Sequence, residues 1–211
     1  MTDGWTLAAK ARTEYADMVA ELTPRQLEQS TLCDGWTPHD VTAHLATFVE
    51  VPFPKFMFNV AKKKGDFDAA AVTMAKGLAE RPTGDLVETL RAKAGKKASV
   101  PIFPGELTVT DVVVHEQDVR RGLDLPGAPD PELVQTALEF LTTNKRASLL
   151  LEKKGLLDGL RFEATDLDWS HGDGELVKGA GEALLLAMTR RDVYDELEGD
   201  GVATLKQRQR A

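Results

Sequence analysis

The sequence predicts a mainly α-helical protein, with a helical bundle over residues 1–153 and a small α+β domain over residues 156–205. In the first part, apolar residues recur at intervals of three or four, with proline and glycine between the repeats. After Gly155, short alternating stretches separated by glycine and aspartate are typical of a small sheet. Because 42% of the 211 residues are apolar, a buried core can form.

The first two long helices are indicated by periodicity and by a start signal. Residues 5–21 place apolar side chains at helical spacing, namely Leu7, Ala11, Tyr15, Met18 and Leu22. The second helix is predicted to begin at Thr37, whose hydroxyl can cap it, with Pro38 at the first helical position and Asp40 completing a capping box. We expect this helix to continue with a disturbance near Pro52.

Further helices and a sheet are predicted after the second helix. The helices are expected at residues 66–80, from Thr83 or Gly84 to Gly95, from Thr108 to Gly122 or near Pro126, and at residues 131–153. The segment 99–106 is rich in proline and is predicted to be an irregular connection. Residues 160–179 are predicted to form a hairpin or small sheet, and residues 179–197 a single helix.

Charge and composition exclude several classes of partner. The chain has 34 acidic and 26 basic residues, a formal charge of −8, which argues against a nucleic-acid binder. No apolar run approaches the roughly 18 residues needed to span a bilayer, and the N-terminus lacks a signal-peptide core, so no membrane partner is expected. The single cysteine, Cys33, excludes a disulfide within the chain and favours a cytoplasmic protein.

Two acid–histidine pairs are the candidate chemistry of the chain. Asp40 and His44 lie four residues apart on one predicted helix, and Asp111 and His115 lie four apart on another. This spacing places each pair on one helix face, as a metal site in a bundle core requires. Imidazole and carboxylate suit Zn²⁺, and three protein ligands would leave one position open for water or substrate.

A structural explanation exists for the same residues. Asp40 can be the acid of the capping box that starts at Thr37, and Asp111 can belong to a similar box that starts at Thr108. His44 can be a buried, hydrogen-bonded core histidine. The spacing alone leaves both interpretations open.

Longer motifs indicate a family. The segment TLCDGWTPHDVTAHLA at residues 31–46 resembles the start of the second helix in the DinB-like superfamily, in its actinobacterial mycothiol-dependent maleylpyruvate isomerase branch. The segment DVVVHEQDVRRGLDLPG at 111–127 is similar to the acid-x-x-x-His-x-x-Asp segment of that branch. Stretches within residues 164–205, among them VKGAGEALLLAMTRRD, resemble its small C-terminal domain.

The resemblance implies a DinB-like four-helix bundle that holds one divalent metal, usually zinc. Carried over by position, the metal ligands are His44, Asp111 and His115. The isomerase has glutamate at the acid position. Because Asp111 is one methylene shorter, it is expected to act either directly or through a water molecule.

Two more residues are candidates for catalysis. Asp118 lies three residues after His115 and can accept a hydrogen bond from an imidazole N–H, or instead pair with Arg120 or Arg121. By resemblance, Arg190 is a candidate for binding the acidic thiol or substrate, since Thr189-Arg190 stands where the family commonly has Gly-Arg. Its alternative role is that of a cation at a helix C-terminus.

Two neighbours of these positions are expected to have structural roles. We expect Cys33, which lies just outside the second helix, to be an unreactive thiol, and Trp36 to pack at the end of the bundle or line the mouth of a pocket.

The leading functional hypothesis is a metal-dependent, mycothiol-type transferase or isomerase acting on a small electrophilic, acidic molecule. The expected partners are mycothiol as the thiol cosubstrate and this small substrate, for a monomer or homodimer. A metal-dependent hydrolase is one alternative, because an open metal site can activate water. A non-catalytic metal-binding or stress-related ligand-binding protein is another.

Overall fold

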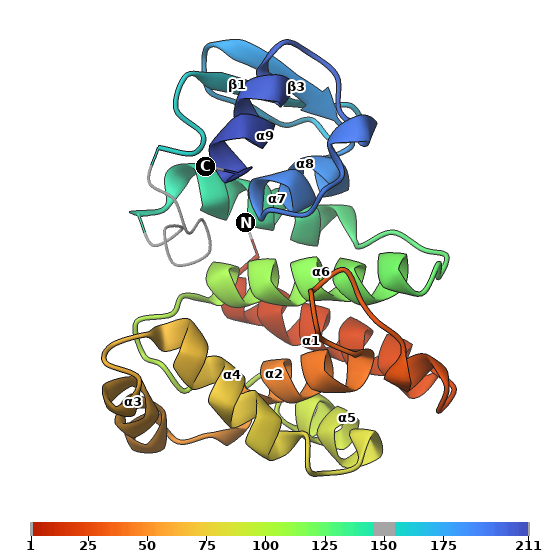
Figure 1. Cartoon of the computed structure of the whole chain (residues 1–211), viewed down its shortest axis with the longest axis vertical. Coiled ribbons are helices and arrows are strands. Elements are labelled where there is room, and N and C mark those ends of the chain that lie inside the picture. Colours follow the sequence, from red (N-terminus) through yellow and green to blue (C-terminus); the bar gives the residue numbers. More distant parts are fainter. Residues whose placement is uncertain (1, 146–154, 211) are drawn as a thin grey trace. The chain divides into compact units, whose positions relative to one another are not determined.

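The computed structural model describes residues 2–145 and 155–210, which fall into two compact units, residues 1–127 and 128–211. Figure 1 shows a helical first unit and a second unit that combines helices with a small sheet. The mainly α-helical class predicted from the sequence is confirmed. No helix in the described residues is both long enough and apolar enough to cross a membrane.

Six α-helices make up the first unit. They are α1 (Gly4–Ala20), α2 (Pro38–Glu50), α3 (Phe53–Lys62), α4 (Phe67–Leu78), α5 (Thr83–Ala92) and α6 (Gly105–Gly122), and a short 3₁₀ turn, η1 (Gln26–Glu28), follows α1. Helix α1 packs against α5 and α6, and α2 packs against α4, α5 and α6 (Figure 1). The four helices α1, α2, α5 and α6 therefore form the bundle, and α3 and α4 lie in the connection between α2 and α5.

The start of α2 has the predicted geometry. The Thr37 hydroxyl accepts the Asp40 N–H, and the Asp40 carboxylate accepts the Thr37 N–H at 3.0 Å. This capping box satisfies donors that the first turn of a helix leaves open. The predicted disturbance near Pro52 is a full break, because α2 ends at Glu50 and the separate helix α3 begins at Phe53.

Helix α6 begins three residues earlier than predicted. Its first residue is Gly105, after Pro104, so the segment expected to be an irregular connection already contributes to the helix. A Cβ atom on Gly105 would lie 2.3 Å from the carbonyl carbon of Gly4, so only glycine allows α1 and α6 to approach this closely. Thr108 lies inside the helix, and the capping box predicted between it and Asp111 does not form.

The second unit holds a three-stranded sheet in the order β2-β1-β3. Its strands are β1 (Leu160–Ala164), β2 (Ser170–His171) and β3 (Glu175–Gly179), with β1 antiparallel to β2 and parallel to β3. Its helices are α7 (Pro131–Thr143), α8 (Gly181–Met188) and α9 (Gly201–Arg210). Helix α8 packs on α7 and on the sheet. The compact units thus divide before α7, whereas the sequence placed the boundary after residue 153. The helix predicted over residues 131–153 is too long, because α7 ends at Thr143 and Asn144 is extended, while residues 146–154 lie outside the described residues.

The single helix predicted over residues 179–197 is wrong. Helix α8 ends at Met188, and a short 3₁₀ turn, η3 (Tyr194–Glu196), follows. The chain leaves the helix through Arg190, whose φ of 74° lies in the left-handed region, and the Arg191 N–H donates to the Leu186 carbonyl oxygen at 2.9 Å. This backbone pattern is a common way to end a helix, and glycine usually occupies the left-handed position.

Candidate metal centre

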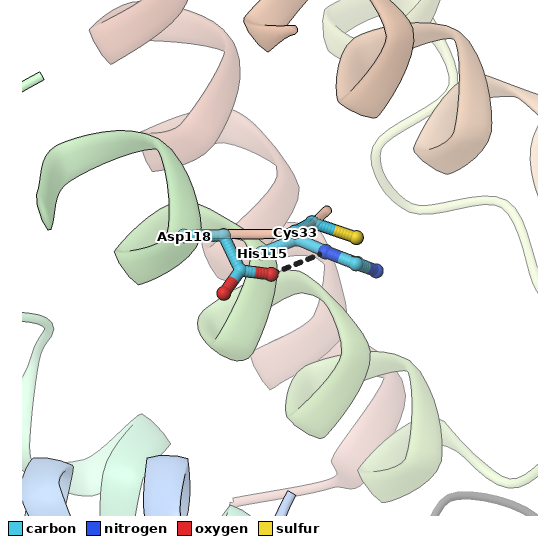
Figure 2. A group of neighbouring side chains, drawn as sticks. All are labelled: Cys33, His115 and Asp118. Atoms are coloured by element: carbon cyan, nitrogen blue, oxygen red, sulfur yellow. Dashed lines mark hydrogen bonds and ion pairs between the residues drawn. The ribbon is translucent and has the colours of Figure 1, made fainter. Parts of the chain in front are cut away.

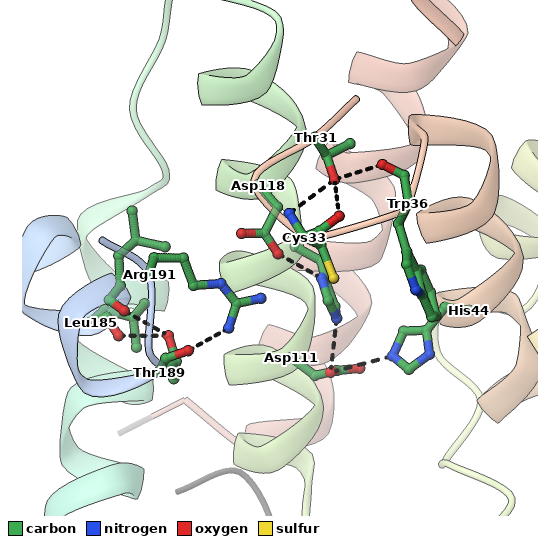
Figure 3. A network of polar contacts seen from close by, with 11 residues as sticks. Thr31, Cys33, Trp36, His44, Asp111, Asp118, Leu185, Thr189 and Arg191 are labelled. Carbon is green, nitrogen blue, oxygen red and sulfur yellow. Dashed lines mark hydrogen bonds and ion pairs between the residues drawn. The ribbon is translucent and has the colours of Figure 1, made fainter. Parts of the chain in front are cut away.

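Three predicted ligands meet between α2 and α6. His44 projects from α2, and Asp111 and His115 lie one turn apart on α6. The Oδ1 atom of Asp111 lies 3.6 Å from Nε2 of His44 (Figure 3). The same oxygen lies 3.7 Å from Nε2 of His115. The ring centroids of the two histidines are 5.0 Å apart. All three side chains are largely buried, with exposed fractions of 12–16%.

These separations suit one divalent cation. In a tetrahedral zinc site with bonds of about 2.0–2.1 Å, neighbouring ligand atoms are roughly 3.3 Å apart. The two distances from Asp111 Oδ1 exceed this value by only a few tenths of an ångström. Direct ligation by Asp111, despite its short side chain, is therefore compatible with the helix positions. Three donors also leave a fourth coordination position for an outside molecule.

Asp118 orients one of the two imidazoles. Its side chain is fully buried, and its Oδ2 lies 2.9 Å from Nδ1 of His115 (Figure 2). An ionised carboxylate can only accept, so the His115 Nδ1–H donates to Asp118, and in the neutral ring this leaves the lone pair on Nε2, the nitrogen nearer to Asp111. Arg120, one of the rival partners predicted for Asp118, donates instead to Glu116 at 2.7 Å.

His44 is positioned by aromatic contacts. Its Nδ1 atom is buried and has no hydrogen-bond partner among the described residues. The ring instead meets Trp36 and Phe48 edge-on, with centroid distances of 5.2 and 5.3 Å. Trp36 also lies nearly parallel to the His115 ring, at 6.4 Å. Trp36 was predicted to pack at the end of the bundle or to line the mouth of a pocket. The structure places its ring against both imidazoles.

The loop before α2 folds back onto α6. The Leu32 N–H donates to the Asp118 carbonyl oxygen at 3.0 Å, and the Trp36 N–H donates to the Cys33 carbonyl oxygen at 3.0 Å. A Cβ atom on Gly122 would lie 2.6 Å from the Cα of Thr31, so this glycine allows the close approach. The fold-back brings the half-buried Cys33 thiol next to His115 and Asp118, which the sequence did not predict.

The charged groups around the candidate metal ligands were also not predicted from the sequence. Arg12 on α1 is almost fully buried, and its Nη1 donates to the carbonyl oxygens of Ala94 and Lys96. Burial lowers the pKa of Arg12 to about 10, while the charge of Asp111 acts in the opposite direction. The guanidinium therefore remains charged at neutral pH. Nothing in the helical periodicity separates Arg12 from an ordinary surface arginine.

A carboxylate at the start of α4 also acts on the site. Partial desolvation of Asp68, together with the charge of Asp66, raises the pKa of the Asp68 carboxyl group. Smaller effects of His44, which lowers this pKa, and Asp111, which raises it, act on the same group. The site thus has a negative neighbour that is not one of the predicted ligands.

Arg190 lies in the second unit, after α8. It is exposed, whereas the next residue, Arg191, is half-buried and its Nη1 donates to the Thr189 carbonyl oxygen at 2.6 Å (Figure 3). Arg190 has a positive φ, which glycine adopts more readily than arginine. The role of Arg190 in binding the acidic thiol or substrate stays a prediction.

Comparison with known proteins supports the resemblance seen in the motifs. Residues 8–51 match the family model described as the mycothiol maleylpyruvate isomerase N-terminal domain. This segment includes His44 but ends well before Asp111 and His115. No match was found among curated protein sequences.

Two solved structures share the fold. The crystal structure of a histidine-to-alanine mutant of mycothiol-dependent maleylpyruvate isomerase is 15% identical, with a TM-score of 0.55, covering 95% of this chain and 96% of its own. The crystal structure of mycothiol-dependent maleylpyruvate isomerase gives 14% identity and a TM-score of 0.52 at the same coverage. The predicted resemblance to this family and its fold is confirmed.

Proposed function

We propose that the protein is a metal-dependent enzyme that uses a low-molecular-weight thiol of the mycothiol type as a transferase or isomerase. The observation that carries the proposal is the convergence of His44, Asp111 and His115, whose candidate ligand atoms all lie within 4.8 Å of one another. Three protein ligands would leave a fourth coordination position for an outside molecule. The choice of mycothiol as the thiol is supported by the family model over residues 8–51 and by the shared fold.

The donor set fits a zinc ion or a similar divalent cation. His44 and His115 would bind it through Nε2 and Asp111 through its carboxylate. A cation held there would lower the pKa of a bound thiol and so provide a thiolate at neutral pH.

The residues around these ligands have supporting tasks. Asp118 keeps the proton of His115 on Nδ1, so the ligating nitrogen stays available. Trp36 and Phe48 hold the His44 ring by edge contacts and cover it with apolar surface. Covering the site excludes water and so strengthens the attraction between its charges.

The substrate would be a small electrophile. The names of the two similar structures suggest maleylpyruvate or a related unsaturated acid. A carboxylate on such a molecule suits an arginine, because guanidinium and carboxylate form two parallel hydrogen bonds. We assign this task to Arg191 rather than Arg190, because Arg190 has the positive φ that suits the glycine of the Gly-Arg pair implied by the resemblance.

The activity is tested by incubating the zinc-loaded protein with mycothiol and a small electrophile. A transferase would consume both and form a thioether, while an isomerase would convert maleylpyruvate and regenerate the thiol. Conversion that remains after mycothiol is omitted would contradict the thiol-dependent proposal.

A hydrolase is the second candidate, because the same open coordination position can activate water. Hydrolysis of esters or amides at equal rates with and without thiol would support it. A protein that binds zinc stoichiometrically but turns over neither set of substrates would be a metal-binding or ligand-binding protein.

A further inference from the structure

Arg12 on α1 is a cation in the interior of the first unit. Only 2% of the residue is exposed, and its Nη1 atom donates to the carbonyl oxygens of Ala94 and Lys96 at 2.8 and 2.6 Å. Its other terminal nitrogen, Nη2, is buried and has no hydrogen-bond partner among the described residues. Burying a charge without complete pairing is costly, so packing alone does not explain an arginine at this position.

The position of Arg12 along α1 corresponds to the level of the metal centre along α6. The two helices pack against each other, and the backbones of their first residues, Gly4 and Gly105, approach closely, so both helices run in the same direction (Figure 1). Arg12 lies eight residues after Gly4. The same advance along α6 reaches the turn between Asp111 and His115, because every residue of an α-helix adds about 1.5 Å.

The face of α1 that carries Arg12 also contacts α2 near its candidate ligand. The hydroxyls of Tyr15 on α1 and Thr42 on α2 are buried and lie 3.0 Å apart, and Thr42 is two residues before His44. Arg12 precedes Tyr15 by three residues, so the two side chains share one face of α1. Burial lowers the pKa of Arg12 and the charge of Asp111 raises it, so these two groups are close enough to interact.

Two acidic groups near the candidate ligands oppose the binding of an anion. A divalent cation held by two neutral imidazoles and one carboxylate keeps a single positive charge. The carboxylate of Asp118 at His115, and that of Asp68, add negative charge around it. A thiolate is itself negative, so these acids weaken its attraction to the metal. A fixed cation near Asp111 offsets them.

We propose that Arg12 is a positioning residue of the metal centre, a buried cation that acts through Asp111 and lets the metal accept an anion at its fourth coordination position. The inference rests on the proposed function, in which His44, Asp111 and His115 hold the metal and the anion is a thiolate. By attracting the charge of Asp111, the guanidinium weakens the hold of this ligand and leaves the metal a stronger Lewis acid. This effect needs no contact with the metal or the substrate, because charges act over several ångströms in a protein interior.

Removing the charge of Arg12 should change two affinities in opposite directions. Without the cation, Asp111 holds the metal more strongly, so the affinity for the metal rises. The metal then attracts an anion less, so the affinity for a thiolate falls. Structural damage at the site would lower both affinities, and the opposite signs therefore distinguish the electrostatic role from a packing role.

The test uses Co²⁺ in place of zinc, because the absorption bands of Co²⁺ report on its ligands. Competition with a chelator measures the Co²⁺ affinity of the wild type, Arg12→Gln and Arg12→Lys. Titration of each Co²⁺-loaded protein with azide and with 2-mercaptoethanol at pH 7 measures its affinity for an anion and for a thiol. Both variants keep an N–H donor, and only Arg12→Lys keeps the charge.

We expect Arg12→Gln to bind Co²⁺ about tenfold more tightly than the wild type, and azide and the thiol about tenfold more weakly. Arg12→Lys should stay within about threefold of the wild type in every titration, because its charge is retained. Arg91→Gln is the matched control, since Arg91 forms an exposed pair with Asp17 at 2.6 Å, and it should change none of these affinities. Circular dichroism confirms that each variant is folded, and Arg12→Met is the second neutral variant if Arg12→Gln is not.

Three results would overturn the inference. They are a neutral variant in which both affinities fall or neither changes, an Arg12→Lys variant that behaves like the neutral one, and a wild-type Co²⁺ protein that binds neither azide nor the thiol. Failure of the proposed function is seen separately, because a wild-type protein without the metal site would bind no Co²⁺ at all. None of these measurements depends on turnover.

Discussion

Asp118 is fully buried, and its Oδ2 lies 2.9 Å from Nδ1 of His115, so an acidic side chain in the interior of the bundle contacts a candidate metal ligand. Burying a carboxylate is costly unless it has hydrogen-bond partners. The carboxylate fixes the proton of His115 and directs its other nitrogen toward Asp111.

The first prediction concerns this pair. Asp118→Ala should lower zinc affinity by roughly 10- to 100-fold, because the ligand imidazole loses the group that orients it. Competition titration with a zinc chelator measures the effect. Asp40→Ala is the matched control, since Asp40 belongs to the capping box of α2. It should reduce thermal stability and leave zinc affinity unchanged, and equal zinc loss in both variants would contradict the assigned role.

A second prediction uses the contacts of Trp36 with both histidines. Zinc binding should change the tryptophan fluorescence, because a cation alters the charge on the rings that Trp36 touches. Trp36→Phe should remove most of this change. Trp169→Phe is the control, because Trp169 contacts His171 in the second unit. A zinc signal that survives in Trp36→Phe and disappears in Trp169→Phe would refute the placement of the site.

A third prediction follows from the raised pKa of Asp68. A carboxyl group whose pKa is higher in the folded protein than in the unfolded chain destabilises the fold once it is ionised. This effect disappears at a pH below the pKa of the group in the unfolded chain, which is about 3.9. In metal-free protein, Asp68→Asn should therefore raise the unfolding temperature at pH 7 but not near pH 3.

The control for this prediction is Asp66→Ala. The Asp66 side chain caps α4 by accepting the Ala69 N–H at 2.9 Å, so its loss should cost about 0.5–2 kcal/mol of stability at pH 7. Thermal unfolding monitored by circular dichroism compares the two variants. A lower unfolding temperature for Asp68→Asn at pH 7 would show that the sign is wrong.

A fourth prediction separates the two arginines after α8. Arg190→Gly should keep or increase stability, because glycine adopts a φ of 74° without strain. Arg191→Ala should raise the KM for an acidic thiol or substrate by about tenfold or more, the usual loss when a guanidinium–carboxylate pair is removed. Steady-state kinetics with both variants tests the assignment. A KM that is raised in Arg190→Gly but unchanged in Arg191→Ala would assign the binding of the carboxylate to Arg190.

Much of the site could be predicted because its signals are local. The capping box at Thr37 sets the start of α2 and hence the direction of His44, and both acid and histidine of α6 lie on one helix face. The family motifs then decided between a metal ligand and a capping acid for Asp111. The structure removes the capping explanation, since α6 begins at Gly105.

The remaining features depend on contacts between distant parts of the chain. The early start of α6 follows from the approach of Gly105 to Gly4, and the position of Cys33 follows from the approach of Thr31 to Gly122. The end of α8 depends on a left-handed arginine, which is uncommon for a residue with a side chain. Helical periodicity carries no information about such close approaches.

The most direct test of the account is the zinc content of purified wild-type protein, His44→Ala, His115→Ala and His39→Ala. His39 is the control, because its ring bonds to Thr83 and to the Ala79 carbonyl oxygen, both at 2.8 Å, and belongs to neither metal-binding group. We predict about one zinc per chain in the wild type and in His39→Ala, and a large loss in the other two, as expected when one of three protein ligands is removed. Full zinc content in both His44→Ala and His115→Ala would contradict the central claim.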